Sequence, residues 1–82
     1  MNPTKNKSKF NFKSGMLVKY IGKRSSNYFW ILGSGEYTND KNYHKIQPGQ
    51  VGLFIKHHFD TCEEVLFDDV IITLGTCYLE LV

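Results

Sequence analysis

The sequence lacks any apolar run of the length that a membrane-spanning helix needs, which is about 20 residues. Its most apolar segment, residues 70–82, is interrupted by two threonines, a glycine and a glutamate. Residues 1–14 are basic and polar, and they lack the apolar stretch of a secretory signal. We therefore expect the chain to remain in the compartment where it is made, which is the cytoplasm.

Cysteine is scarce. The only two, Cys62 and Cys77, are too few for a disulfide-stapled scaffold and predict free thiols. With His57 and His58 they are residue types that bind zinc, but no Cys-x-x-Cys pair exists and the spacing fits no familiar zinc finger. Adjacent histidines in an extended segment also point in opposite directions. We expect no metal site and no cofactor.

A catalytic motif is also lacking. Either cysteine with a histidine could form a nucleophile pair, and Asp68-Asp69 could form an acid pair. The two aspartates are better explained as the turn of a hairpin. Neither cysteine lies at a predicted helix N-terminus or in a basic pocket that would activate its thiol. We therefore expect that the protein is not an enzyme.

Acidic and basic residues are separated along the 82 residues, which form one domain at most. Residues 1–24 carry basic side chains and no acid: Lys5, Lys7, Lys9, Lys13, Lys19, Lys23 and Arg24. Residues 57–82 carry acids and no lysine or arginine: Asp60, Glu63, Glu64, Asp68, Asp69 and Glu80. This asymmetry indicates either a basic arm or a small fold whose two halves partly neutralise each other.

The apolar residues of the chain predict an all-β fold. They form short segments that are rich in β-branched and aromatic side chains, and none of these segments has a helical period. The predicted strands are residues 16–21, 28–32, 51–55, 64–67, 70–73 and 78–82. Alternation assigns a set of side chains to the core: Val18, Tyr20, Phe29, Ile31, Val51, Leu53, Ile55, Val65, Phe67, Leu79 and Leu81. We expect residues 1–14 to form a flexible basic arm and residues 15–82 to form the folded unit.

Turn signals separate these strands. Pro48-Gly49 predicts a type II turn, and Asp68-Asp69 predicts the tight turn of a hairpin. Gly52 allows a neighbouring strand to approach closely. Residues 75–77 predict a tight turn, or one turn of 3₁₀ helix. The segments 22–27, 36–46 and 56–61 are predicted loops.

The order of these pieces resembles the small SH3-like barrel superfold. That superfold implies an all-β barrel of five to six antiparallel strands, here preceded by the basic arm. Residues 48–56 also resemble the start of the KOW motif of ribosomal and transcription-associated proteins, without its basic residues. The short, arm-bearing chain is similar in style to bacteriophage accessory proteins, which would place it in the host cytoplasm or the virion.

Aromatic residues provide the first candidate site. Peptide-binding barrels dock extended segments in an aromatic-lined groove, and the predicted protein-binding set is Phe10, Phe12, Tyr28, Trp30, Tyr37, Tyr43 and His44. The alternative for Trp30 is that it fills the core, and we favour this alternative because a short chain rarely exposes its only tryptophan. Polar neighbours predict that Tyr37 and Tyr43 are exposed.

Basic residues provide the second candidate. A nucleic-acid surface would use Lys5, Lys7, Lys9, Lys13, Lys19, Lys23, Arg24 and Lys45. The alternative is a solvated tail, and the isoelectric point of 8.6 is below the value of about 9 that is typical of dedicated nucleic-acid binders. We expect a binding or assembly module that docks onto a protein partner or larger complex, with nucleic-acid binding as the alternative. The sequence leaves the oligomeric state open and predicts no membrane partner.

Overall fold

The computed structural model describes residues 12–82, and within them the fold is all-β with no α-helix. The seven strands are β1 (Leu17–Tyr20), β2 (Tyr28–Trp30), β3 (Tyr43–Lys45), β4 (Val51–Phe59), β5 (Cys62–Phe67), β6 (Val70–Gly75) and β7 (Leu79–Leu81). Two single turns of 3₁₀ helix, η1 (Asp40–Asn42) and η2 (Thr76–Tyr78), lie between strands. The predicted arm residues Lys5, Lys7, Lys9 and Phe10 lie outside the described residues.

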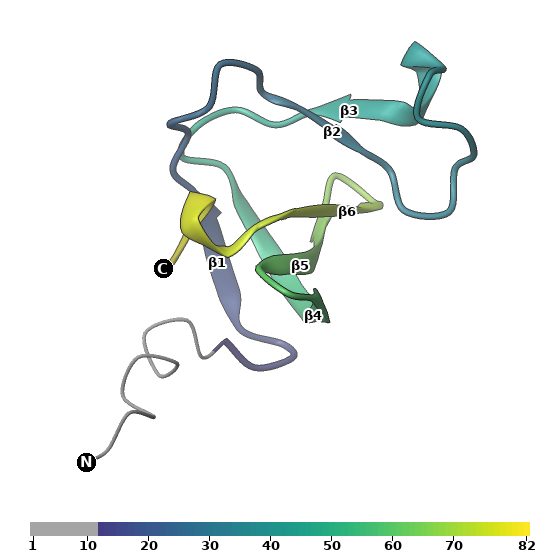
Figure 1. Cartoon of the computed structure of the whole chain (residues 1–82). Coiled ribbons are helices and arrows are strands. Elements are labelled where there is room, and N and C mark those ends of the chain that lie inside the picture. Colours follow the sequence, from purple (N-terminus) through teal and green to yellow (C-terminus); the bar gives the residue numbers. More distant parts are fainter. Residues whose placement is uncertain (1–11) are drawn as a thin grey trace.

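The strands form two antiparallel sheets. Five strands pair in the order β6-β5-β4-β1-β7, and β2 pairs with β3 in a two-stranded ribbon. Figure 1 shows this ribbon running along the top of the molecule, above β1, β4 and β5. A single bridge between Ile31 and Ile72, with a hydrogen bond of 2.8 Å from Leu32 N to Ile71 O, connects the ribbon to β6.

The core lies between the ribbon and the inner face of the larger sheet. Its buried apolar side chains are Val18, Tyr20, Phe29, Ile46, Phe54, Val65, Phe67, Ile72, Leu74 and Leu79. The predicted inward positions Val18, Tyr20, Phe29, Val65 and Phe67 are confirmed. Ile31 is partly buried against this core.

The prediction for β4 was wrong in phase. Gly52 and Phe54 face the core, whereas Val51 is 46% exposed and Leu53 and Ile55 are only partly buried. Gly52 is the residue that pairs with buried Val18, and this register turns the odd-numbered residues outward. Both faces of this strand carry apolar residues, so hydrophobicity alone did not identify the inner face.

Two predicted loops contain strands. β4 continues through residues 56–59, where Lys56 pairs with Glu64 and His57 with Glu63, and only Asp60 and Thr61 form the turn. The predicted loop 36–46 contains η1 and β3. β3 is the strand beyond the predicted five to six, and it forms because it pairs with β2.

The predicted turns at Pro48-Gly49 and Asp68-Asp69 are both present in the structure. Gly49 has a φ of 93°, and Gln50 N donates to Gln47 O at 2.9 Å, as a turn at Pro48-Gly49 requires. Asp68 and Asp69 both have positive φ, 49° and 70°, between β5 and β6. This is the backbone of a two-residue type I′ hairpin turn.

The closing strand differs from its prediction at one position. Leu79 is buried, but Leu81 is 51% exposed, although its register opposite Val18 directs it to the same side of the sheet. β7 is the edge strand of the sheet, and Leu81 lies at its end, where little of the molecule covers it. In the part of the chain described, no helix is both long and apolar enough to cross a membrane.

Candidate aromatic binding site

The β2-β3 ribbon presents aromatic side chains outward. Phe29 pairs with His44, and it is buried in the core, so the alternating positions lie on the opposite face of the ribbon. On that face Tyr28 pairs with Lys45, and Trp30 pairs with Tyr43. The unbroken row of large residues in β2 therefore divides into one core residue and two outer aromatic residues.

The segment that joins β2 to β3 is held by local hydrogen bonds. Gly33 and Gly35 adopt positive φ and turn the chain after β2. The Asn42 side-chain amide donates to Glu36 O at 2.9 Å, which fastens the end of η1 to the start of the loop. Asn39 caps η1 by accepting from Lys41 N at 2.9 Å. These contacts fix where Tyr37 lies.

Trp30 is partly buried by this loop and does not belong to the core, so the favoured alternative of a core tryptophan was wrong. Its ring lies against Tyr37, with the ring centroids 4.8 Å apart at an interplanar angle of 47°. Its indole Nε1 donates to Gly35 O at 3.1 Å. The loop thus covers Trp30, and no burial in the core is needed.

Three tyrosines line one open hollow. It has a volume of about 710 Å³, and its lining residues are Tyr28, Tyr37, Thr38, Asp40 and Tyr43. Tyr28 is 52% and Tyr37 is 68% exposed, although they are large aromatic residues. The predicted exposure is confirmed for Tyr37, whereas Tyr43 is partly buried. Sequence reasoning identified the tyrosines, but it missed Thr38 and Asp40, because only the folded loop brings Asp40 to the rings.

His44, a predicted site residue, does not line the hollow. Its Nε2 lies 3.0 Å from Asp68 Oδ2, and Gln50 Nε2 donates to the same oxygen at 2.8 Å. The hydrogen bond from His44 is the main cause that lowers the pKa of Asp68 below 3.8, and the bond from Gln50 adds to it. His44 therefore connects β3 to the β5–β6 turn.

Several predicted nucleic-acid residues make contacts within the chain. Lys19 forms an ion pair with Glu80 at 3.3 Å. The Arg24 guanidinium lies 4.4 Å from the Phe29 ring centroid and 5.7 Å from that of Tyr78, so it caps the core edge. Lys45 Nζ lies 6.0 Å from the Tyr28 ring centroid. Lys13 and Lys23 are exposed.

Phe12, the described member of the predicted aromatic arm pair, packs on the core. Its ring centroid lies 5.6 Å from that of Phe54. Two hydrogen bonds attach the residues that follow: Ser14 Oγ donates to Ile55 O at 2.5 Å, and Gly15 N donates to Phe54 O at 2.9 Å. The chain is therefore anchored from Phe12 onward.

A second polar cluster, which the sequence did not reveal, lies at the β4–β5 hairpin. Glu63 and Glu64 are buried, and they pair with His57 at 2.8 Å and with His58 at 2.9 Å. Thr76 Oγ1 lies 2.9 Å from Glu63 Oε2. Each buried carboxylate therefore has a histidine as its hydrogen-bond partner, and the partners of this cluster all lie within the described part of the chain.

The remaining candidate metal ligands were the two cysteines. Cys62 and Cys77 are free thiols, as predicted. Among residues 12–82, no three side chains of His, Cys, Asp or Glu are grouped in a way that could hold a metal ion. The aromatic hollow is thus the site that the geometry favours.

Comparison of the chain with protein-family models, with curated proteins and with solved structures gave no match. The residues of the hollow and their geometry are therefore the basis for inferring the function.

Proposed function

We propose that this protein is a non-enzymatic binding module that docks a protein partner through the aromatic hollow. The observation that carries the proposal is the set of three tyrosines around one concavity, of which Tyr28 and Tyr37 are exposed and Tyr43 is partly buried. Tyrosine gives a large contact area at a small cost in side-chain entropy, and it is enriched at protein interfaces. An exposed aromatic cluster of this kind is typical of a recognition surface.

Contacts within the surrounding loop support the same proposal. The Trp30–Tyr37 contact and the hydrogen bond from Asn42 to Glu36 O hold the loop in one arrangement before any partner binds. A site that is formed in advance loses less conformational entropy on binding. The hollow is also open, which suits an extended segment of a partner better than an enclosed small molecule.

The topology supports an SH3-like barrel as the finer description of the fold. The β5-β6 hairpin after β4 and the single 3₁₀ turn before the last strand agree with the chain order that resembles that superfold. The bridge from Ile31 to Ile72, which connects the two sheets, is consistent with this description. In this description the aromatic hollow belongs to the long hairpin that follows the first strand.

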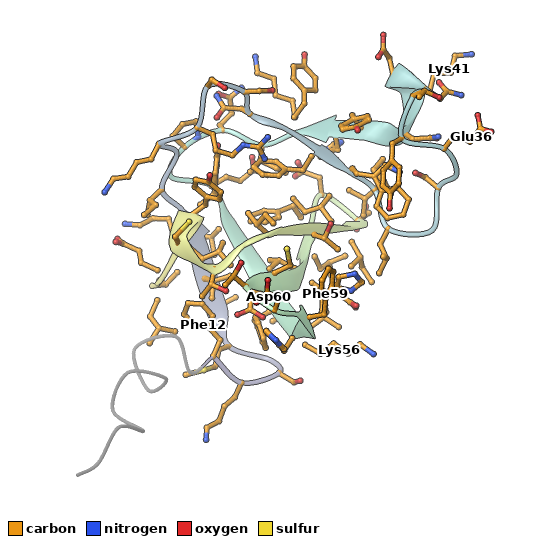
Figure 2. All side chains as sticks on the ribbon, viewed as in Figure 1. Phe12, Glu36, Lys41, Lys56, Phe59 and Asp60 are labelled. Carbon is orange, nitrogen blue, oxygen red and sulfur yellow. The ribbon has the colours of Figure 1, made fainter. Side chains whose placement is uncertain are left out.

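The test is affinity capture from native lysate with the full-length protein, with and without nuclease. We compare the wild type with Tyr37→Ala and with the matched control Phe59→Ala. Tyr37 and Phe59 are 68% and 63% exposed. In Figure 2, Phe59 lies well below the loop that carries Glu36 and Lys41.

We expect a stoichiometric protein partner that survives nuclease, that is lost with Tyr37→Ala and that is retained with Phe59→Ala. Partner binding that persists with Tyr37→Ala contradicts the proposed site. Recovery of nucleic acid, with proteins released by nuclease, would support the alternative function instead, in which Lys45 and the tyrosines contact a single strand.

A further inference from the structure

The hollow combines aromatic side chains with a carboxylate. Tyr28, Tyr37 and Tyr43 provide the rings, and Asp40 provides the carboxylate. The face of an aromatic ring carries a partial negative charge that attracts cations. No lysine or arginine belongs to the lining. The lining is therefore complementary to a positively charged group.

Asp40 is available to a ligand. It is exposed at the first position of η1, and none of the ion pairs formed within residues 12–82 uses it. The N-cap of η1 is Asn39, so the Asp40 side chain is not needed to cap the helix. Its charge therefore has no partner of opposite sign among the described ion pairs.

Lys45 brings a positive charge near one of these rings. It lies opposite Tyr28 in the β2-β3 register, and its Nζ is 6.0 Å from the Tyr28 ring centroid. This distance is at the limit of a cation–π contact. An ammonium group thus lies near a tyrosine of the hollow without belonging to its lining, and it would repel a second cation there.

We propose that the hollow binds a lysine side chain of the protein partner, with its alkyl chain against the tyrosine rings and its ammonium group near Asp40. This inference deepens the proposed function and rests on it. At about 710 Å³ the hollow has room for a lysine side chain and for the neighbouring part of an extended peptide. The charge of the lining decides the class of side chain, and the rings accept its apolar stem.

The experiment uses two probes on the full-length protein at constant ionic strength: Nα-acetyl-lysine methylamide and its neutral counterpart, Nα-acetyl-norleucine methylamide. We monitor the tyrosine ring protons by NMR. The lysine probe is expected to shift resonances of Tyr28, Tyr37 and Tyr43, and the norleucine probe to bind at least several-fold more weakly. Equal binding of the two probes, or no binding of the lysine probe, would overturn the inference.

Two charge variants sharpen the test. Asp40→Asn is expected to weaken binding of the lysine probe about 2–5-fold, and Lys45→Gln is expected to strengthen it about 2-fold, because a like charge is removed. The matched control is Asp69→Asn, an exposed aspartate in the β5–β6 turn, which should change nothing. A single-stranded nucleic acid would respond in the opposite direction to both variants, and that result would also overturn the inference.

This inference and the proposed function fail separately. If Tyr37→Ala abolishes capture of the partner while Asp40→Asn leaves it unchanged, the module binds its partner but the lysine inference is wrong. If Tyr37→Ala leaves capture unchanged, the proposed function itself is wrong, whatever the probes do.

Discussion

Gly52 lies directly under the ring of Phe67: a Cβ atom at Gly52 would be 2.7 Å from Phe67 Cε1 and 2.8 Å from Leu66 O. Gly52 on β4 is buried and pairs with Val18 on β1, while Phe67 is 1% exposed. The absence of a side chain at position 52 therefore allows the ring to fill the core. This contact also fixes which face of β4 points inward.

Gly52→Ala is expected to destabilise the fold by about 1–3 kcal/mol, because the added methyl group overpacks the core. The free energy of unfolding in urea measures this effect. A double-mutant cycle with Phe67→Leu is the control, since the smaller side chain makes room for the methyl group. We expect the double variant to be more stable than the sum of the single effects. If the stability changes of the two single variants simply add in the double variant, the contact between position 52 and the Phe67 ring is contradicted.

The phase of β4 illustrates what sequence patterns can predict. In β1, Lys19 identified the solvent face, so Val18 and Tyr20 were assigned correctly to the core. In β4 the even-numbered set offers only Gly52 and Phe54, and the odd-numbered set looks more apolar. The odd-numbered residues lie on the outer face, where Leu53 pairs with Leu17 and with Leu66. Period-two alternation cannot choose between two apolar faces.

The aromatic hollow shows a second limit. Polar neighbours in the sequence pointed to Tyr37 and Tyr43, whereas Tyr28 begins an apolar run. β3 was missed, since Tyr43-His44-Lys45 has no hydrophobic pattern and becomes a strand by pairing with β2. Asp40 reaches the rings through η1 and two glycines with positive φ. Whether Asp40 lies beside the tyrosines depends on the path of the whole loop, and local residue propensities do not determine that path.

Thr76 supports a buried carboxylate. Its Oγ1 lies 2.9 Å from Glu63 Oε2 and 2.9 Å from Thr61 O, while His57 holds the other Glu63 oxygen. Thr76→Val keeps the shape but removes the hydroxyl, so we expect a loss of about 1–3 kcal/mol. Thermal and urea unfolding measure it. The control, Thr61→Val, changes an exposed side chain and keeps the Thr61 carbonyl, so it should cost much less.

Tyr20 makes the fold sensitive to alkali. Its side chain is fully buried, and its Oη donates to Asn27 Oδ1 at 2.5 Å. Burial raises the pKa of Tyr20 above 10.0, with a smaller opposing effect from Arg24. The folded state thus holds the proton more tightly than the unfolded state does. The associated stability is present below about pH 10 and is lost as the pH rises through the raised pKa.

The measurement for Tyr20 is the free energy of unfolding as a function of pH from neutral to strongly alkaline. The wild type should lose stability above pH 10, with tyrosinate absorbance that rises together with the loss of structure. Tyr20→Phe is expected to cost about 1 kcal/mol at neutral pH and to depend less steeply on alkaline pH. A variant curve parallel to that of the wild type would contradict the assignment.

Asp68 contributes to stability in the opposite pH range. Hydrogen bonds from His44 and then Gln50 lower its pKa below 3.8, so its contribution is present above that value and is lost as the pH falls through the lowered pKa. Asp68→Asn should therefore flatten the acid limb of the stability curve. Asparagine tolerates the φ of 49° at this position, so the hairpin turn is kept.

The control for Asp68 is His44→Ala, which removes the first of the two hydrogen bonds. It should flatten the acid limb in part, and combining it with Asp68→Asn should flatten the limb no further than Asp68→Asn alone. An unchanged acid limb in Asp68→Asn would show that other carboxyl groups govern acid unfolding.

The role of the N-terminal arm can be separated from the stability of the fold, because Phe12 packs on Phe54 with the ring centroids 5.6 Å apart. Deleting residues 1–14 removes this contact and the bond from Ser14 to Ile55 O, so it should destabilise the fold by about 1–3 kcal/mol. Deleting residues 1–11 keeps both contacts and should leave stability within about 0.5 kcal/mol. If the arm docks the partner, deleting residues 1–11 is already sufficient to abolish capture from lysate.

Capture that survives the deletion of residues 1–11 assigns partner binding to the folded unit. Capture that is lost only when residues 1–14 are deleted indicates an effect of destabilisation.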